Sequence, residues 1–168
     1  NYNSLEQQNL IILNELKEIP NSLTTALKSF TDNGGKLLVI PSNDISVNTY
    51  NQLFNGFGLS SFGGLNSVEK KITTINYSHP LLTNVFDKRV SNFQYPKVNG
   101  FYANATSSVS SILSFEDGTS FLAQSGNAYR FSAAVDDKNS NFKNSPLIVP
   151  VLYKFPVFKL CFPILYKT

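Results

Sequence analysis

Two short, unbroken apolar segments flank an amphipathic one in the stretch Leu10–Ser42. The segments Leu10–Leu13 and Leu37–Ile40 contain no polar position, as expected for strands buried on both faces of a sheet. Apolar residues recur between them at helical spacing, at Leu23, Ala26, Leu27 and Phe30. Asn33-Gly34-Gly35 predicts the end of that helix, because glycine adopts the left-handed conformation found there. The order strand, helix, strand predicts a βαβ unit with parallel strands.

The hydrophobic pattern changes after this unit. Val47–Phe54 still has helical spacing and predicts a second helix. From Val68 onward the apolar positions tend to alternate, which predicts half-buried antiparallel strands. Glu116–Thr119 has the composition of a tight turn, so Ile112–Phe115 and Ser120–Gln124 are predicted to form a hairpin. A parallel core with an antiparallel extension is therefore expected.

The chain divides into a domain and a tail. Residues 1–155 are predicted to form one α/β domain that lacks its first βα units, and residues 156–168 form an apolar tail. Because the chain opens almost directly on the strand Leu10–Leu13, that strand is expected to lie at a sheet edge. Unpaired edges pair readily with other chains. We therefore expect either a homodimer through this edge or its covering by the tail.

Composition and charge exclude several classes of protein. Hydrophobic residues make up 42% of the chain and aromatic residues 13%, enough for a core. Charged residues make up only 15%, which is more usual outside the cytoplasm but is equally explained by low-GC coding bias. The net charge of +3 is small and scattered, so no nucleic-acid partner is expected. No run of about 20 apolar residues is present, so no membrane span is predicted.

The residues that bind metals and cofactors are sparse. The single cysteine, Cys161, excludes a disulfide framework and a cysteine-based zinc site. Asp136–Asn141 lacks the glycine and the terminal glutamate of a calcium loop. No glycine-rich dinucleotide motif follows a predicted strand. We therefore predict no metal and no cofactor.

Several segments of the chain resemble segments of one protein family, and they occur in the same order along the sequence. LIILNELKEIPNSLTTALKSFTDNGGKLLVIPS, at Leu10–Ser42, resembles class I glutamine amidotransferase-like domains, and more closely those of BatA-type membrane proteins of Bacteroidetes. Tyr77–Phe86 and Ser140–Tyr153 resemble further segments of those proteins, the first also of ThuA-like relatives. The resemblance covers most of residues 8–155. It implies a flavodoxin-like three-layer sandwich with parallel core strands, on the extracytoplasmic (periplasmic) side of a membrane-anchored protein.

The residues that would carry the family's chemistry depart from its pattern. Active members place a cysteine in a Gly-x-Cys-x-Gly turn after the strand that ends here at Ile40, whereas this chain has Pro41-Ser42-Asn43. His79 is followed by Pro80-Leu81 rather than completing a His-x-Glu pair. We therefore expect a non-catalytic interaction or scaffold domain. Its crevice, at the carboxyl ends of the strands, should be lined by Glu15, Ser42 and Asn43 and hold a protein partner or a glycan.

Two alternatives remain open at this point. A degenerate hydrolase or amidotransferase would use Ser42 as nucleophile and His79 as base, with their atoms about 2.6–3.2 Å apart. A sugar-binding module would instead present tyrosine rings on one exposed face, whereas buried rings would belong to the core. The candidate rings are Tyr50, Tyr77, Tyr95, Tyr102 and Tyr129.

Overall fold

The computed structural model describes residues 2, 4–83, 94–104, 110–148, 151 and 164–166. The α-helices whose bounds are described are α1 (Asn21–Asp32) and α2 (Val47–Phe57), and the described 3-10 turns are Leu5–Gln7 and Phe142–Asn144. The described strands are β1 (Leu10–Asn14), β2 (Lys36–Ile40), β3 (Phe62–Asn66), β4 (Lys70–Ile75), β5 (Lys97–Val98), β6 (Phe101–Asn104), β7 (Ser110–Phe115), β8 (Ser120–Ser125), β9 (Ala128–Phe131) and β10 (Ile164–Tyr166).

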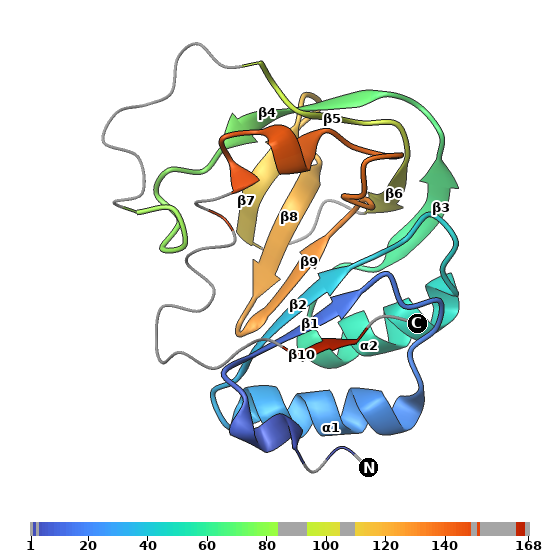
Figure 1. Ribbon diagram of the computed structural model, residues 1–168, viewed down its shortest axis with the longest axis vertical. Coiled ribbons are helices and arrows are strands. Elements are labelled where there is room, and N and C mark those ends of the chain that lie inside the picture. Colours follow the sequence, from blue (N-terminus) through green and yellow to red (C-terminus); the bar gives the residue numbers. More distant parts are fainter. Residues whose placement is uncertain are drawn as a thin grey trace.

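One mixed sheet forms the centre of the molecule (Figure 1). Its strand order is β10-β1-β2-β9-β8-β7-β4-β5. The first four strands in this order run parallel to one another, and each later pair is antiparallel. The parallel pairing of β1 with β2 and the β7–β8 hairpin are confirmed. β3 and β6 pair separately as a small antiparallel sheet, which we call the ribbon.

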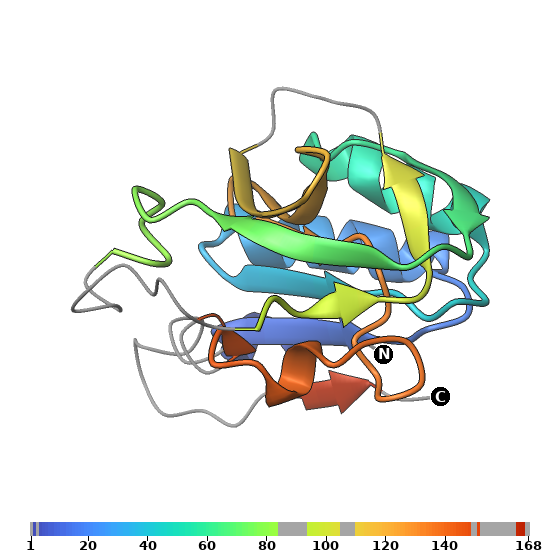
Figure 2. The same cartoon turned by 90° about the horizontal axis from the view of Figure 1, so that it is seen from above.

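The expected three-layer sandwich with a parallel core is wrong. Both helices cover the same face of β1 and β2 (Figure 2), where Leu27 and Leu53 join one apolar cluster with Leu13 and Val39. In the described residues the opposite face is covered by the 3-10 turn that carries Phe142 and by Leu147, Ile148 and Val151, the last two of which are helical. After α2 the chain enters the ribbon instead of another parallel strand, and antiparallel strands complete a mostly β structure.

The tail covers the edge of β1. Ile164, Leu165 and Tyr166 of β10 pair in parallel with Ile11–Leu13. The expectation that the tail would cover this edge is confirmed for these three pairs, and the homodimer stays a prediction. Cys161 and parts of the two further segments that carry the resemblance, residues 84–86, 149–150 and 152–153, lie outside the described residues. Within the described part, no helix is both long enough and apolar enough to cross a bilayer.

Candidate functional site

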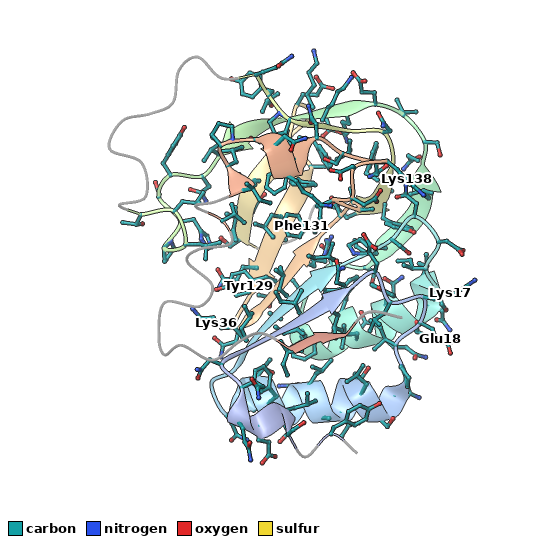
Figure 3. The ribbon with its side chains drawn as sticks, viewed as in Figure 1. Lys17, Glu18, Lys36, Tyr129, Phe131 and Lys138 are labelled. Carbon is teal, nitrogen blue, oxygen red and sulfur yellow. The ribbon has the colours of Figure 1, made fainter. Side chains whose placement is uncertain are left out.

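Three parallel strands bring their following loops to one edge of the molecule. β1, β2 and β9 run in the same direction, so the loops after them lie at the same end of the sheet. Figure 3 shows Lys17 and Glu18, which follow β1, on the same side as Lys138, which follows β9. Lys36, at the start of β2, lies on the opposite side. We call the first side the carboxyl edge.

The three residues predicted to line a crevice are at the carboxyl edge. The Glu15 amide donates a 2.8 Å hydrogen bond to the Ile40 carbonyl oxygen, and Glu15 has a positive φ of 58°. The Ser42 hydroxyl oxygen accepts the Asp44 amide at 3.3 Å. This bond closes a short local turn, as serine hydroxyls often do. The Ser42 side chain therefore organises its own loop.

Buried tyrosine hydroxyl groups hold two loops of this edge. Tyr102 donates to the Ser42 carbonyl oxygen at 2.8 Å, and Tyr50 donates to the Leu16 carbonyl oxygen at 2.6 Å. Burial raises the pKa of both phenols, and for Tyr50 the neighbouring Tyr102 and Glu15 raise the pKa further. Both hydroxyls therefore stay protonated and keep donating across the physiological pH range.

Tyr95 differs in exposure from the other four tyrosines that were candidates for a sugar-binding face. Tyr50, Tyr102 and Tyr129 are between 0% and 5% exposed and belong to the core. Tyr77 is half-buried. Tyr95 is 47% exposed and lies outside this core. A face built from all five rings is therefore absent, and Tyr95 alone remains an exposed aromatic candidate among the described tyrosines.

Asn139 connects the carboxyl edge to the loop after β9. Its side chain is buried, and its Nδ2 donates to the carbonyl oxygens of Gly100 at 2.9 Å and Ala134 at 2.8 Å. Its Oδ1 accepts a 3.1 Å hydrogen bond from Asn43 Nδ2. Sequence reasoning missed Asn139, because its partners Asn43 and Gly100 lie far away in sequence and asparagine is common in loops. Asn43 is thus fixed by a buried amide.

The structure does not bring His79 to Ser42. His79 is buried after β4, where its Nδ1 accepts the Leu81 amide at 3.1 Å. Burial lowers the pKa of His79, and a hydrogen bond with the Gln124 side chain opposes this shift. Gln124 of β8 pairs with Tyr129 of β9, and Tyr129 pairs with Leu38 of β2. Because Ser42 follows Leu38 by four residues, Ser42 lies about 13 Å along the strands from the level of Gln124, the residue whose side chain contacts His79.

A buried arginine lies beneath α2 and the ribbon, in register with Val39 of β2. The Arg130 guanidinium is 4.8 Å from the ring centroid of Phe62 and 5.5 Å from that of Phe54, and it donates to the Ser60 hydroxyl. Arg130 is 0% exposed, and its Nε and Nη1 have no hydrogen-bond partner among the described residues. Burial lowers the pKa of Arg130 to about 10, so it remains charged at neutral pH.

The described residues do not assemble a metal centre. They contain no group of three or more histidine, cysteine, aspartate and glutamate side chains placed to hold an ion. In the segment that superficially resembles a calcium loop, Asp136 Oδ1 accepts the Lys138 amide at 2.9 Å. That carboxylate therefore stabilises a turn. The carboxyl edge presents polar side chains, among which the Ser42 hydroxyl accepts the Asp44 amide.

Comparisons with known proteins define the fold of this chain. A ThuA-like protein of Bacteroides uniformis is similar over 91% of this chain and 69% of its own, with a TM-score of 0.59 and 13% identity. The mmIFT52 N-terminal domain is similar over 92% of this chain and 82% of its own, with a TM-score of 0.55 and 16% identity. A β-galactosidase of Marinomonas ef1 has a TM-score of 0.59 and 14% identity over 88% of this chain.

These likenesses concern the fold alone. This chain spans only 20% of the β-galactosidase, so that enzyme's activity belongs to a much longer protein. No family model matches the chain, and no curated protein matches it. The resemblance to glutamine amidotransferase-like and BatA-type proteins therefore stays a prediction.

Proposed function

We propose that this chain is a non-catalytic interaction domain that binds a partner at its carboxyl edge. One observation carries the proposal. Ser42 occupies the position after β2 where the resembling enzymes have their nucleophile, yet its hydroxyl accepts the Asp44 amide and its carbonyl accepts the Tyr102 hydroxyl. The only histidine of the chain accepts the Leu81 amide and contacts Gln124, whose level in the sheet is about 13 Å from Ser42 along the strands. Nucleophilic catalysis needs a base within hydrogen-bond reach.

The geometry also supports a binding role for this edge. Glu15, Ser42 and Asn43 hold polar groups on loops that backbone, tyrosine and asparagine hydrogen bonds fix in place. A binding surface gains affinity when its groups are already ordered before the partner arrives. Open α/β sheets bind their ligands at this end of the strands.

A reactivity experiment tests the non-catalytic part. The folded chain is incubated with a fluorophosphonate probe, which labels activated serines whatever their substrate, and glutamine hydrolysis is followed in parallel. We expect no labelling and no glutamate release beyond those of the Ser42→Ala variant. Labelling that is lost in both Ser42→Ala and His79→Ala, with both variants still folded by circular dichroism, would overturn the proposal.

A cross-linking experiment tests the binding part in the full-length protein in its native cells. A photoreactive amino acid replaces Asn43 in one variant and Lys36, at the opposite end of β2, in a matched control. We expect a discrete adduct from position 43 and none from position 36. Adducts of equal yield from both positions, or none from position 43, would contradict a partner at the carboxyl edge.

The resemblance to BatA-type proteins further supports an extracytoplasmic (periplasmic) position in a membrane-anchored protein. Fusion of alkaline phosphatase to the end of this domain in the full-length protein tests the position, because the reporter is active only outside the cytoplasm. An inactive but stable fusion would argue against it.

A further inference from the structure

Two adjoining depressions flank β5 and meet at Lys97 and Asn141. The first, which we call the amide depression, continues from the buried Asn139 that holds Asn43. It is lined by Lys97, Asn99, Asp137, Asn139, Asn141 and Asn144. The second, which we call the tyrosine depression, is lined by Glu69, Lys71, Gln94, Tyr95, Lys97 and Asn141. Their volumes of about 290 and 360 Å³ lie at the lower end of the range for small-molecule sites.

Side-chain amides in the amide depression are oriented before any ligand arrives. Asn141 Oδ1 accepts the Lys97 amide at 2.8 Å, which leaves its Nδ2 as a donor. Asn99 Nδ2 donates to the Lys138 carbonyl oxygen at 3.3 Å, which leaves its Oδ1 as an acceptor. A donor and an acceptor are thus held at one site by the backbone. A hydroxyl group is both donor and acceptor, so it matches this pair.

The charges of the two depressions balance. Their lining contains two cationic side chains, Lys71 and Lys97, and two anionic ones, Glu69 and Asp137. Lys97 forms an ion pair with Glu69, and Asp137 lies 3.9 Å from Lys143. A lining without net charge provides little attraction for a phosphate, a carboxylate or a metal ion. The chemistry therefore favours a neutral ligand rich in hydroxyl groups.

Tyr95 adds an apolar surface beside these polar groups. Its side chain is 47% exposed, and it is the one aromatic residue among the exposed large hydrophobic residues that the structure describes. A tyrosine ring presents an apolar face together with a polar end. Sugar rings combine an apolar C–H face with a rim of hydroxyl groups. The C–H face can pack on the Tyr95 ring, and the hydroxyl groups can hydrogen-bond to the side chains of Asn99 and Asn141.

We propose that the two depressions bind a neutral glycan, with one sugar ring against Tyr95 and the hydroxyl groups of the next at Asn99 and Asn141. This inference rests on the proposed binding role and assigns its ligand class. The adjoining Asn139–Asn43 contact places the site next to the carboxyl edge.

Calorimetric titration of the chain with neutral hexasaccharides of glucose, mannose and N-acetylglucosamine tests the proposal. We expect saturable binding of at least one of them. Tyr95→Ala should weaken that binding by at least about tenfold, as expected for a central aromatic contact.

Asn141→Asp keeps the oxygen that accepts the Lys97 amide and removes the Nδ2 donor, so it should also weaken binding while the fold is kept. Val68→Ala, at an exposed position in neither depression, is the matched control and should bind as the unaltered chain does.

Three results would overturn the glycan assignment. The first is no binding of these probes at millimolar concentration, and the second is binding that Tyr95→Ala and Asn141→Asp leave unchanged. The third is a protein adduct at position 43 that Tyr95→Ala abolishes while the glycans do not bind, which would make this surface a protein interface. None of these results restores catalysis to Ser42, so failure of the glycan assignment is distinct from failure of the non-catalytic role.

Discussion

The hydroxyl of Tyr102 donates a 2.8 Å hydrogen bond to the carbonyl oxygen of Ser42. Tyr102 belongs to the ribbon, and its ring stacks on Phe62 with centroids 4.9 Å apart. The bond therefore connects the loop after β2 to an aromatic cluster beneath the ribbon. It fixes the Ser42 backbone to the apolar core.

Removal of this hydroxyl should destabilise the chain without disturbing its packing. Tyr102→Phe keeps the buried ring but leaves the Ser42 carbonyl without this donor, so the free energy of unfolding should fall by about 1 kcal/mol. Urea unfolding measures the change, and hydrogen exchange should quicken at Asn43 and Asp44. Val68→Ala, at an exposed position, should change stability by less than about 0.5 kcal/mol. Equal stability of the Tyr102→Phe variant and the unaltered chain would contradict this role.

Adjacent glycines after α1 should respond differently to alanine. A Cβ at Gly35 would lie 2.2 Å from the Phe30 ring, which is buried against β1 and β2, so Gly35→Ala forces a core side chain to move. We expect a loss of about 1–3 kcal/mol in thermal or urea unfolding. Gly34→Ala meets no atom within 4 Å but has a φ of +93°, so its cost should be only the backbone strain, about 1–2 kcal/mol.

A double substitution with Phe30→Leu separates these two effects. The smaller side chain gives the new methyl group space, so it should relieve part of the cost of Gly35→Ala and none of the cost of Gly34→Ala. Additive costs in both double variants would show that Phe30 is not the obstacle.

The elements that the sequence predicted are those whose signal is local. The apolar segments of β1 and β2, the stripe of α1 and the turn of the β7–β8 hairpin each occupy a few consecutive residues. The prediction of a three-layer sandwich was wrong because one βαβ unit does not determine which elements follow it. The next strand beside β2 is β9, which the chain reaches only after it has formed several antiparallel strands. Asn139 and Arg130 gave no local signal, since their partners Asn43 and Ser60 lie 96 and 70 positions away.

Arg130 carries a buried positive charge that no acidic side chain among the described residues neutralises. Removal of the charge, with the volume of the side chain kept, should therefore be tolerated. Arg130→Met keeps an apolar stem between Phe54 and Phe62 and removes the charge and two unpartnered nitrogen atoms. We expect stability to stay equal or to rise by up to about 3 kcal/mol. Arg130→Ala leaves a cavity and should lose about 2–4 kcal/mol. Destabilisation of the methionine variant as large as that of the alanine variant would show that the charge itself stabilises the fold.

His79 should make the chain less stable in mild acid. Burial lowers its pKa below 6.5, so the unfolded chain binds a proton more readily than the folded chain. Between the folded-state pKa and 6.5 the unfolded state carries more protons, and the free energy of unfolding therefore rises with pH. The penalty is absent well above 6.5, grows as the pH falls through that value, and becomes constant below the folded-state pKa.

Comparison with His79→Asn isolates this dependence, because His79 is the only histidine and the asparagine oxygen can replace Nδ1 as the acceptor of the Leu81 amide. Asp117, whose pKa is about 2 because hydrogen bonds from Lys70 and Thr119 outweigh its desolvation, titrates far below this range. Urea unfolding from about pH 7.5 to about pH 5 should show the unaltered chain losing stability relative to the variant. A difference that is independent of pH would show that His79 gains its proton as readily in the folded state as in the unfolded one, and a difference that favours the unaltered chain in acid would show that it does so more readily.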